Sequence, residues 1–325
     1  MKKSNPRFVI SLDFELMWGV RDNRSIQNYG KNILGVRMSI PAMLSLFRKY
    51  KVKATWATVG LLLYGSKKEL FNNIPPELPK YDNLNLNPYP YLNYIGDNEK
   101  DDPFHYGLSL AQKIVECDGM ELASHTFSHY YCLESGQSIA QFKEDLKASK
   151  NALKSLTSSD PISLVFPRNQ YNSKYLPACR DLGFKTFRGN ELSWLYGASR
   201  KVTQLKRGAR LADAYFPLSG DNSFEPQLEN GMVNVAASRF LRPYNHSLGF
   251  MQSFHVSRIK ASMKKAAVSG KSYHLWWHPH NFGLNLSENI IVLEDILKYF
   301  KFLESEYGMV SSTMGDFSVM QDDLE

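Results

Sequence analysis

Short apolar runs alternate with stretches of helical periodicity along most of the chain. The runs have the length of strands and cover residues 8–12, 53–59, 120–124, 162–166, 185–189, 232–237 and 272–277. The helical patterns between them cover residues 37–50, 108–117, 138–156, 173–182, 252–269 and 286–306. This alternation predicts an α/β fold of parallel strands with helical crossovers, and seven such units suggest a barrel or a strongly curled sheet.

Two stretches interrupt the alternation. Residues 72–106 are dense in Pro, Asn, Asp and Tyr and keep no sustained period, so we expect a long ordered loop there. Residues 190–231 mix helical and turn signals and are interpreted as a second insertion. The organisation that we expect is therefore a single domain over residues 1–325 with these two insertions.

Charge and apolar content narrow the classes of partner. The net charge of +7 favours anionic partners such as nucleotides or phospholipid headgroups, although the basic residues are spread along the chain. No helix-turn-helix or zinc-finger spacing occurs, so no nucleic-acid partner is expected. No segment approaches about 18 unbroken apolar residues, so we expect no transmembrane segment, while peripheral contact with a membrane remains open.

The N-terminal apolar run is too short for a signal peptide, because it spans only residues 8–12 and ends at Asp13. The three cysteines are scattered and show no C-x-x-C spacing. Both features predict a reduced, cytoplasmic protein.

Polar residues follow several of the predicted strands, and the carboxyl ends of parallel strands share one edge of a sheet, where ligands bind. Asp13 and Glu15 end the first strand and lie one residue apart, so they face the same side while Phe14 faces away. Two carboxylates at such a short separation need a cation or a shared proton between them. The alternative is that both are ordinary loop acids in water.

Histidines follow two other strands. His125 and His129 come directly after the strand at 120–124, and imidazoles four residues apart on a helical turn can bind one metal ion together. His278 and His280 end the last strand and share a strand parity. A role in the core or as a cap could account for one of this second pair.

An arginine follows the strand at 162–166. Arg168 comes after Pro167 in the run LVFPRNQYN, and its guanidinium could bind a carboxylate at the strand-end face. An ordinary loop arginine is an equally good interpretation of this residue on its own.

The order of these motifs resembles that of the polysaccharide deacetylases, the carbohydrate esterase family 4 group of metal-dependent N-deacetylases with NodB homology. The resemblance covers residues 7–315, including the segment KYKVKATWATVG at residues 49–60. It implies a distorted (β/α)7 barrel with long loop insertions, in one catalytic domain.

The resemblance also implies a role for each side chain. The metal ligands would be Glu15, His125 and His129. Asp13 would be the general base, Arg168 the arginine that holds the base, and His278 the general acid. Trp194 would match an aromatic residue that packs on the catalytic histidine.

The chain departs from the family pattern at three points. Glu15 stands where an aspartate is usual, and FPRNQY replaces an arginine-x-proline-x-tyrosine run, which puts the role of Arg168 in question. His280 is a rival to His278 for the general acid.

These inferences predict a metal-dependent hydrolase that removes an N-acyl group, most simply acetyl, from an amino sugar. The ion is expected to be zinc, with cobalt, nickel and manganese as alternatives. The substrate is expected to be a cytoplasmic precursor of a surface polysaccharide, linked to a nucleotide or a lipid whose phosphates suit the basic chain. Two alternatives remain: another C–N hydrolase, such as a deformylase or a cyclic-amide hydrolase, and a non-catalytic carbohydrate-binding relative.

Overall fold

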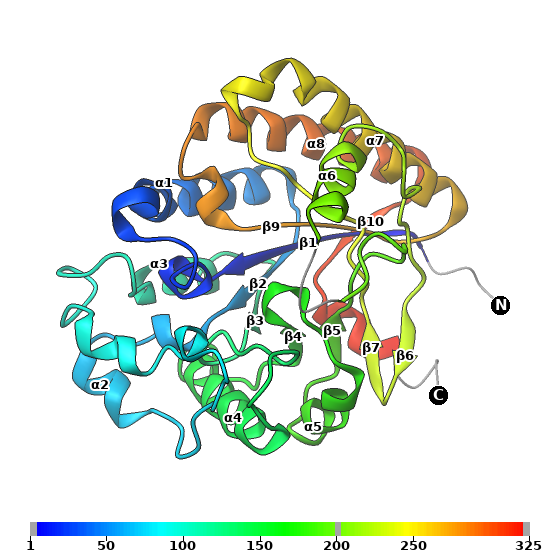
Figure 1. Cartoon of the computed structure of the whole chain (residues 1–325). Coiled ribbons are helices and arrows are strands. Elements are labelled where there is room, and N and C mark those ends of the chain that lie inside the picture. Colours follow the sequence, from blue (N-terminus) through cyan, green and yellow to red (C-terminus); the bar gives the residue numbers. More distant parts are fainter. Residues whose placement is uncertain (1–4, 199–202, 321–325) are drawn as a thin grey trace.

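The computed structural model describes residues 5–198 and 203–320, and a curled, mostly parallel sheet forms its centre (Figure 1). The seven predicted strands are all present. They are β1 (Arg7–Phe14), β2 (Ala54–Thr58), β3 (Met120–Ser124), β4 (Ser163–Val165), β5 (Thr186–Arg188), β7 (Met232–Asn234) and β9 (Tyr273–Trp277). They pair in parallel in the order β7-β5-β4-β3-β2-β1-β9. The α/β class and the curled barrel-type sheet predicted from the sequence are therefore confirmed.

Three short strands complete the sheet. They are β6 (Gln227–Glu229), antiparallel to β7; β8 (Arg239–Phe240), parallel to β9; and β10 (Val310–Ser312), parallel to the start of β1. The segment at 232–241 runs from one end of the sheet to the other. Its Val235 amide donates to the Phe187 carbonyl of β5, and its Leu241 amide donates to the Trp276 carbonyl of β9. One bent segment thus bridges the two ends of a distorted half-barrel.

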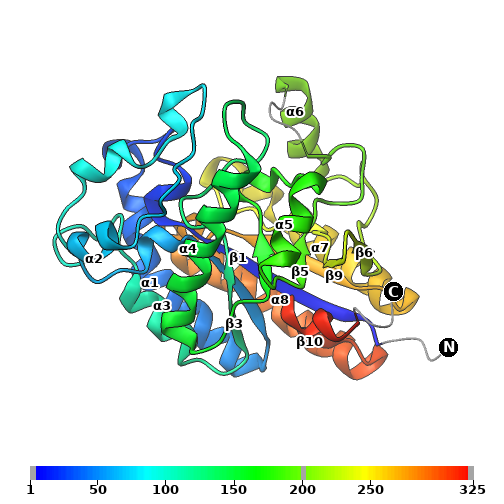
Figure 2. The ribbon, with the colours of Figure 1, turned by 90° about the horizontal axis from the view of Figure 1, so that it is seen from below.

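Helices flank this sheet on its outside (Figures 1 and 2). They are α1 (Ile26–Tyr50), α2 (Lys67–Asn72), α3 (Leu108–Val115), α4 (Ile139–Thr157), α5 (Leu176–Asp181), α6 (Gln204–Asp213), α7 (Gln252–Ser269) and α8 (Leu286–Tyr307). The short helix α6 projects from the body in Figure 2. No helix of the described residues is long and apolar enough to cross a membrane.

The two faces of β1 have different neighbours. Phe8, Ile10 and Phe14 belong to the large core that includes residues of the outer helices, whereas Val9 packs in a small inner cluster with Phe317 near the C-terminus. Because side chains alternate along a strand, Asp13 shares the inner face with Val9. The first predicted acid therefore points into the half-barrel.

The long segment at 72–106 holds only the end of α2 and two 3-10 turns, at Leu84–Leu86 and Pro90–Tyr94. This agrees with the predicted loop. The second predicted insertion, at 190–231, contains α6 and β6, and residues 199–202 lie outside the described part of the chain.

Helix α1 begins eleven residues before the predicted start at residue 37. A capping box of Ser25 and Asn28 starts it, and its first half contains Gly30 and Gly35, which are poor helix formers. Gly35 lies against Gly283, next to the 3-10 turn Pro279–Phe282 that follows β9. A Cβ at either glycine would overlap backbone atoms of the other segment.

This contact predicts opposite effects for two helical glycine substitutions. Gly35→Ala should lower the free energy of unfolding by about 1–3 kcal/mol, because the added methyl has no space. Gly208→Ala in α6 meets open space and should raise it by about 0.5–1 kcal/mol through helix propensity alone. Denaturant unfolding of both variants tests this, and a Gly35→Ala variant as stable as the wild type would contradict the close packing.

Candidate active site

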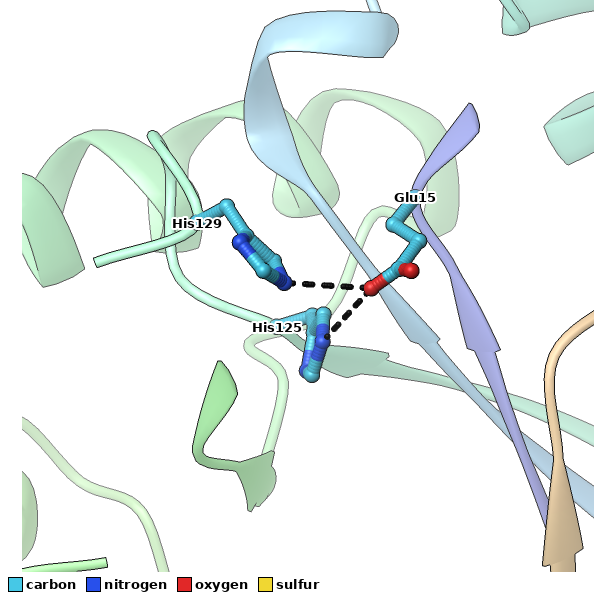
Figure 3. A group of neighbouring side chains, drawn as sticks. All are labelled: Glu15, His125 and His129. Carbon is cyan, nitrogen blue, oxygen red and sulfur yellow. Dashed lines mark ion pairs between the residues drawn. The ribbon is translucent and has the colours of Figure 1, made fainter. Parts of the chain in front are cut away.

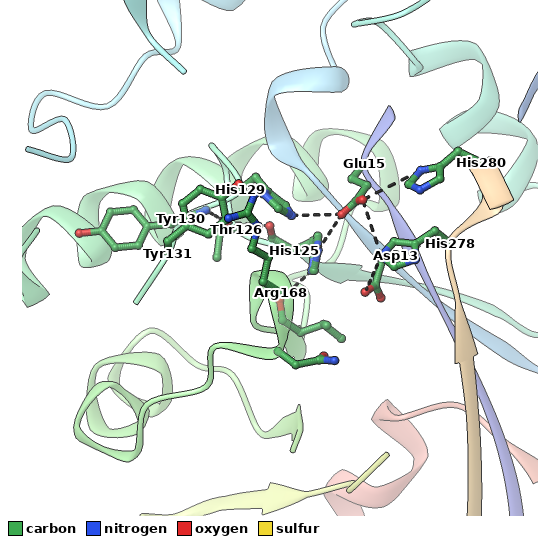
Figure 4. A network of polar contacts seen from close by, with 12 residues as sticks. Asp13, Glu15, His125, Thr126, His129, Tyr130, Tyr131, Arg168, His278 and His280 are labelled. Carbon is green, nitrogen blue, oxygen red and sulfur yellow. Dashed lines mark hydrogen bonds and ion pairs between the residues drawn. The ribbon is translucent and has the colours of Figure 1, made fainter. Parts of the chain in front are cut away.

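Side chains from the ends of β1, β3 and β9 meet in one pocket at the carboxyl edge of the sheet (Figure 4). The cavity has a volume of about 330 Å³, and its lining includes Asp13, Glu15, His129, His278 and His280. His125 lies beneath it, fully buried and within 3.3 Å of Glu15. The structure thus brings together the predicted acids and histidines.

Glu15, His125 and His129 form a compact group (Figure 3). The Glu15 Oε2 atom lies 3.1 Å from His129 Nε2 and 3.3 Å from His125 Nε2. One ligand atom from each of the three residues lies within 4.8 Å of the others. A carboxylate and two imidazoles arranged in this way could hold a divalent ion.

The hydrogen bonds of the two histidines suit this role. His125 Nδ1 lies 2.9 Å from the Val165 carbonyl, so it donates there and leaves Nε2 with a free lone pair. That Nε2 atom is buried and has no hydrogen-bond partner among the described residues. His129 Nδ1 lies 3.0 Å from the Tyr131 hydroxyl. Metal-binding histidines are typically oriented through their other nitrogen in this way, so the residues present fit a metal ion.

The two histidines lie on a loop and not on the helical turn that the spacing suggested. Thr126 and His129 have positive φ values of 62° and 57°, which a helix does not allow. Asp145 of α4 holds this loop, since its carboxylate accepts from the Phe127 amide at 2.7 Å and the Ser128 amide at 3.1 Å. Burial raises the pKa of Asp145 to about 7, although these donors act to lower it. Asp145 is a positioning residue that the motifs did not reveal.

Gly19 leaves the space that the Glu15 carboxylate occupies. A Cβ at Gly19 would overlap the Glu15 carboxyl group, and Gly19 also lines the pocket. The longer side chain of Glu15, compared with the usual aspartate, is thus accommodated by the absence of a side chain four residues later.

Asp13 is held by Arg188 at the end of β5. Arg188 Nη1 and Nη2 each donate to one Asp13 oxygen at 2.7 Å, and the side chains of both residues are almost inaccessible. The guanidinium also lies over the Trp276 ring, 4.4 Å from its centroid. Burial would raise the pKa of Asp13, but the charge and hydrogen bonds of Arg188, together with the nearby His125 and His278, outweigh burial and lower that pKa below its ordinary value.

Arg188 is itself supported from below. It donates to Ser11 Oγ at 2.9 Å, and Ser11 Oγ lies 2.8 Å from His274 Nε2. Burial, together with the charge of Arg188, lowers the pKa of His274 to about 3, so His274 is neutral and can accept the Ser11 hydroxyl proton. A chain of hydrogen bonds from β9 through β1 therefore fixes the guanidinium.

The predicted contact of Arg168 with Asp13 is wrong. Arg168 is bonded to Asp22 instead, and its guanidinium lies 4.5 Å from the Tyr131 ring centroid. It lines the pocket but stands at its rim, because Arg168 and Asn169 adopt positive φ and turn the chain away after Pro167. Arg188 stands at the carboxyl end of the strand predicted at 185–189, and that position is the sequence signal for it.

His278 and His280 lie stacked, with ring centroids 4.9 Å apart. His278 Nε2 is 3.8 Å from Asp13 and 3.7 Å from Glu15, and 23% of its side chain is exposed. His280 is buried, its Nδ1 is 4.0 Å from Glu15, and burial lowers its pKa to about 3. Both predicted histidines therefore reach the site, but only His278 combines proximity to Asp13 with access to solvent.

The aromatic residues on His278 are Trp276 and Phe240, with ring centroids 5.7 Å and 5.8 Å away. Trp194 was expected there, but it is 77% exposed and does not line the pocket. Phe240 lies on β8. This strand has only two residues, which is too short for a periodic pattern in the sequence to predict it.

The histidines also act on the remaining carboxylate. Burial would raise the pKa of Glu15, but His278 and the two histidines beside it lower that pKa well below its ordinary value. Burial lowers the pKa of His129 to about 4. An ionised Glu15 beside a neutral His129 is the protonation state that a metal ion requires of its ligands.

Comparisons with known proteins agree with this picture. A family model described as "Polysaccharide deacetylase" matches residues 34–187, which include His125 and His129 but neither Asp13 nor His278. No curated protein matches the sequence significantly.

Solved structures share the fold at low sequence identity. A putative polysaccharide deacetylase from Mycobacterium smegmatis superposes with a TM-score of 0.64 at 12% identity, covering 99% of this chain and 92% of that one. A probable polysaccharide deacetylase from Pseudomonas aeruginosa PAO1 reaches 0.57 at 11%, covering 99% and 93%. Puue allantoinase reaches 0.56 at 11%, covering 98% and 90%. The family match over residues 34–187 and the shared fold confirm the resemblance to the polysaccharide deacetylases predicted from the sequence.

Proposed function

We propose that this protein is a metal-dependent hydrolase that removes an N-acyl group, most simply acetyl, from an amino sugar. The observation that carries the proposal is the meeting of Asp13, Glu15, His129 and His278 in one pocket above His125. The His125 Nε2 atom, buried without a hydrogen-bond partner among the described residues, supports a metal ion at this point.

Glu15, His125 and His129 would hold the ion, which we propose to be zinc. When bound, it would act as a Lewis acid on the acyl oxygen and make water more acidic. The three ligands would come from two neighbouring parts of the sheet, the end of β1 and the loop after β3.

Asp13 is suited to accept a proton from the attacking water. Arg188 keeps it ionised, and carboxylate oxygens have lone pairs beyond the two that the guanidinium occupies. General base catalysis by a positioned carboxylate contributes typically about 10²–10⁴ to the rate.

His278 is suited to donate a proton to the leaving nitrogen, since an amine anion cannot depart unaided. The Asp13 and Glu15 carboxylates lie 3.8 Å and 3.7 Å from its Nε2 atom, so this nitrogen faces the same space as the proposed base. Phe240 and Trp276 fix the orientation of its ring. Base and acid thus face one cavity from β1 and β9.

For the substrate we propose a phosphate-bearing precursor of a surface polysaccharide, linked to a nucleotide or a lipid. The net charge of +7 supports an anionic substrate. The cytoplasmic location stays a prediction.

A second candidate is hydrolysis of a cyclic amide, since the structure of an allantoinase has the same fold. A deformylase would use the same groups. Measurement of acetate release, formate release and ring opening by the purified protein separates these reactions, and a carbohydrate-binding relative without catalysis would show none of them.

Removal of a proposed ligand should remove the ion. The wild type should contain about one metal ion per chain. His125→Ala should lose both this ion and the hydrolase activity, because a buried ligand atom is missing. His246→Ala, which changes an exposed histidine away from the site, should keep both. Elemental analysis and an acetate-release assay test this, and equal metal in the two variants would contradict the ligand assignment.

The two stacked histidines should differ in their effect on the rate. His278→Ala should lower kcat by about 10²–10⁴, because it removes the proton donor. His280→Ala should have a smaller effect on kcat, since that side chain is buried and its ion-pair contact within 4.0 Å is with Glu15 and not with Asp13. Steady-state kinetics of both variants decides between them, and the opposite order would assign the acid to His280.

The two arginines should differ in their effect on stability. Arg188→Gln leaves the buried Asp13 charge without its partner and should lower the free energy of unfolding by about 3–5 kcal/mol at pH 7. Arg168→Gln removes a partly exposed ion pair and should cost about 1 kcal/mol or less.

The pH dependence gives a control. The lowered pKa of Asp13 stabilises the wild type above the unfolded pKa of about 3.9, and this contribution is lost as pH falls through the folded pKa. The difference in the free energy of unfolding between the wild type and Arg188→Gln should therefore become smaller as the pH falls. Denaturant unfolding at several pH values measures it, and equal losses from both arginine variants would contradict the assignment.

A further inference from the structure

A second cavity, of about 220 Å³, adjoins the pocket that Asp13, Glu15 and His278 line, which we call the catalytic pocket. The two share the lining residues Arg168, Asn169, Phe240 and Trp276. A molecule that reaches His278 past Phe240 and Trp276 can therefore extend into this second cavity, which we call the arginine pocket.

Positive charge dominates the lining. Four arginines line the arginine pocket, Arg168, Arg210, Arg239 and Arg242, against one acidic residue, Glu191. Glu191 accepts a hydrogen bond from Trp276 Nε1 at 3.2 Å.

Two of these arginines have no acidic partner. Within the described residues, no carboxylate lies within 4.0 Å of the guanidinium of Arg210 or Arg242. Arg210 Nε donates to the Leu195 carbonyl, and the Arg242 side chain, half-buried, makes no hydrogen bond there. Half-buried guanidinium groups without a counter-ion are suited to an anionic ligand.

The deeper wall also has an excess of positive charge. Arg239 and Arg258 share the single carboxylate of Asp213. Arg239 is 3% exposed, and its Nε has no hydrogen-bond partner among the described residues. The Asn190 Oδ1 atom in the lining is likewise buried without a partner there.

We propose that the arginine pocket binds a phosphate or diphosphate group attached to the amino sugar, with Arg242 and Arg210 as the principal ligands. This inference rests on the proposed function for the sugar, while the anion site stands on its own residues. The arginine pocket would determine the substrate specificity. With the acyl group of the substrate at His278, its phosphate group would lie beyond Phe240.

Binding of inorganic diphosphate to the full-length protein tests the site without reference to catalysis. Arg242→Gln should weaken it about tenfold or more in calorimetry, because a charge-assisted contact is lost. Arg242→Lys should retain part of the affinity. Arg207→Gln removes the same charge from an exposed position of α6 and should bind as the wild type does. The main-chain N–H of Arg242 donates a hydrogen bond to His255 Nε2. Substitution of the Arg242 side chain leaves this donor in place.

Kinetics then connects the site to the substrate. For the wild type, kcat/KM should be higher for N-acetylglucosamine 1-phosphate than for N-acetylglucosamine, and Arg242→Gln should reduce this ratio about tenfold. UDP-linked and polyprenyl diphosphate-linked N-acetylglucosamine distinguish a nucleotide from a lipid source by which has the higher kcat/KM.

The outcomes separate the two proposals. Equal diphosphate affinity in the wild type and Arg242→Gln would overturn the arginine pocket, even if the protein deacetylates neutral sugars. Arg242-dependent diphosphate binding without any hydrolase activity would support the pocket and overturn the proposed function.

Discussion

The site depends on how two carboxylates, Asp13 and Glu15, stay ionised inside the mouth of a half-barrel. Both are almost inaccessible to solvent, and a buried charge without a partner is very costly. The structure meets this constraint twice, with a rigid guanidinium on Asp13 and with imidazoles around Glu15. Most of the unusual structural features around the site stabilise either the guanidinium that pairs with Asp13 or the imidazoles that surround Glu15.

The two solutions produce different chemistry. Arg188 bonds both oxygens of Asp13 and is fixed in turn by Ser11, Asn169 and the Trp276 ring, so this carboxylate is favoured in its ionised form and held in one orientation. Glu15 faces the Nε2 atoms of His125 and His129, at 3.3 Å and 3.1 Å. The first arrangement suits a base and the second suits a metal ligand.

Two neighbouring strands, β8 and β9, explain why the pocket that holds Asp13 and Glu15 is continuous with the arginine pocket. Trp276 stands between them: it lies under Arg188, contacts His278 and donates to Glu191. Phe240 packs on both Trp276 and His278, and the arginines lie beyond it. The two cavities therefore share one aromatic wall, formed by Phe240 and Trp276 at the junction of β8 and β9.

The sequence by itself determined the seven parallel strands, most of the helices, and the residues Asp13, Glu15, His125, His129 and His278, because apolar periodicity and strand ends are local properties. Only the tertiary structure decided that Arg188, not Arg168, holds Asp13, that Asp145 shapes the histidine loop, and that Gly19 makes room for Glu15. Those pairings join residues distant in sequence or depend on close packing. No local pattern contains them, because they arise only when the sheet curls and brings β1, β5 and β9 around one space.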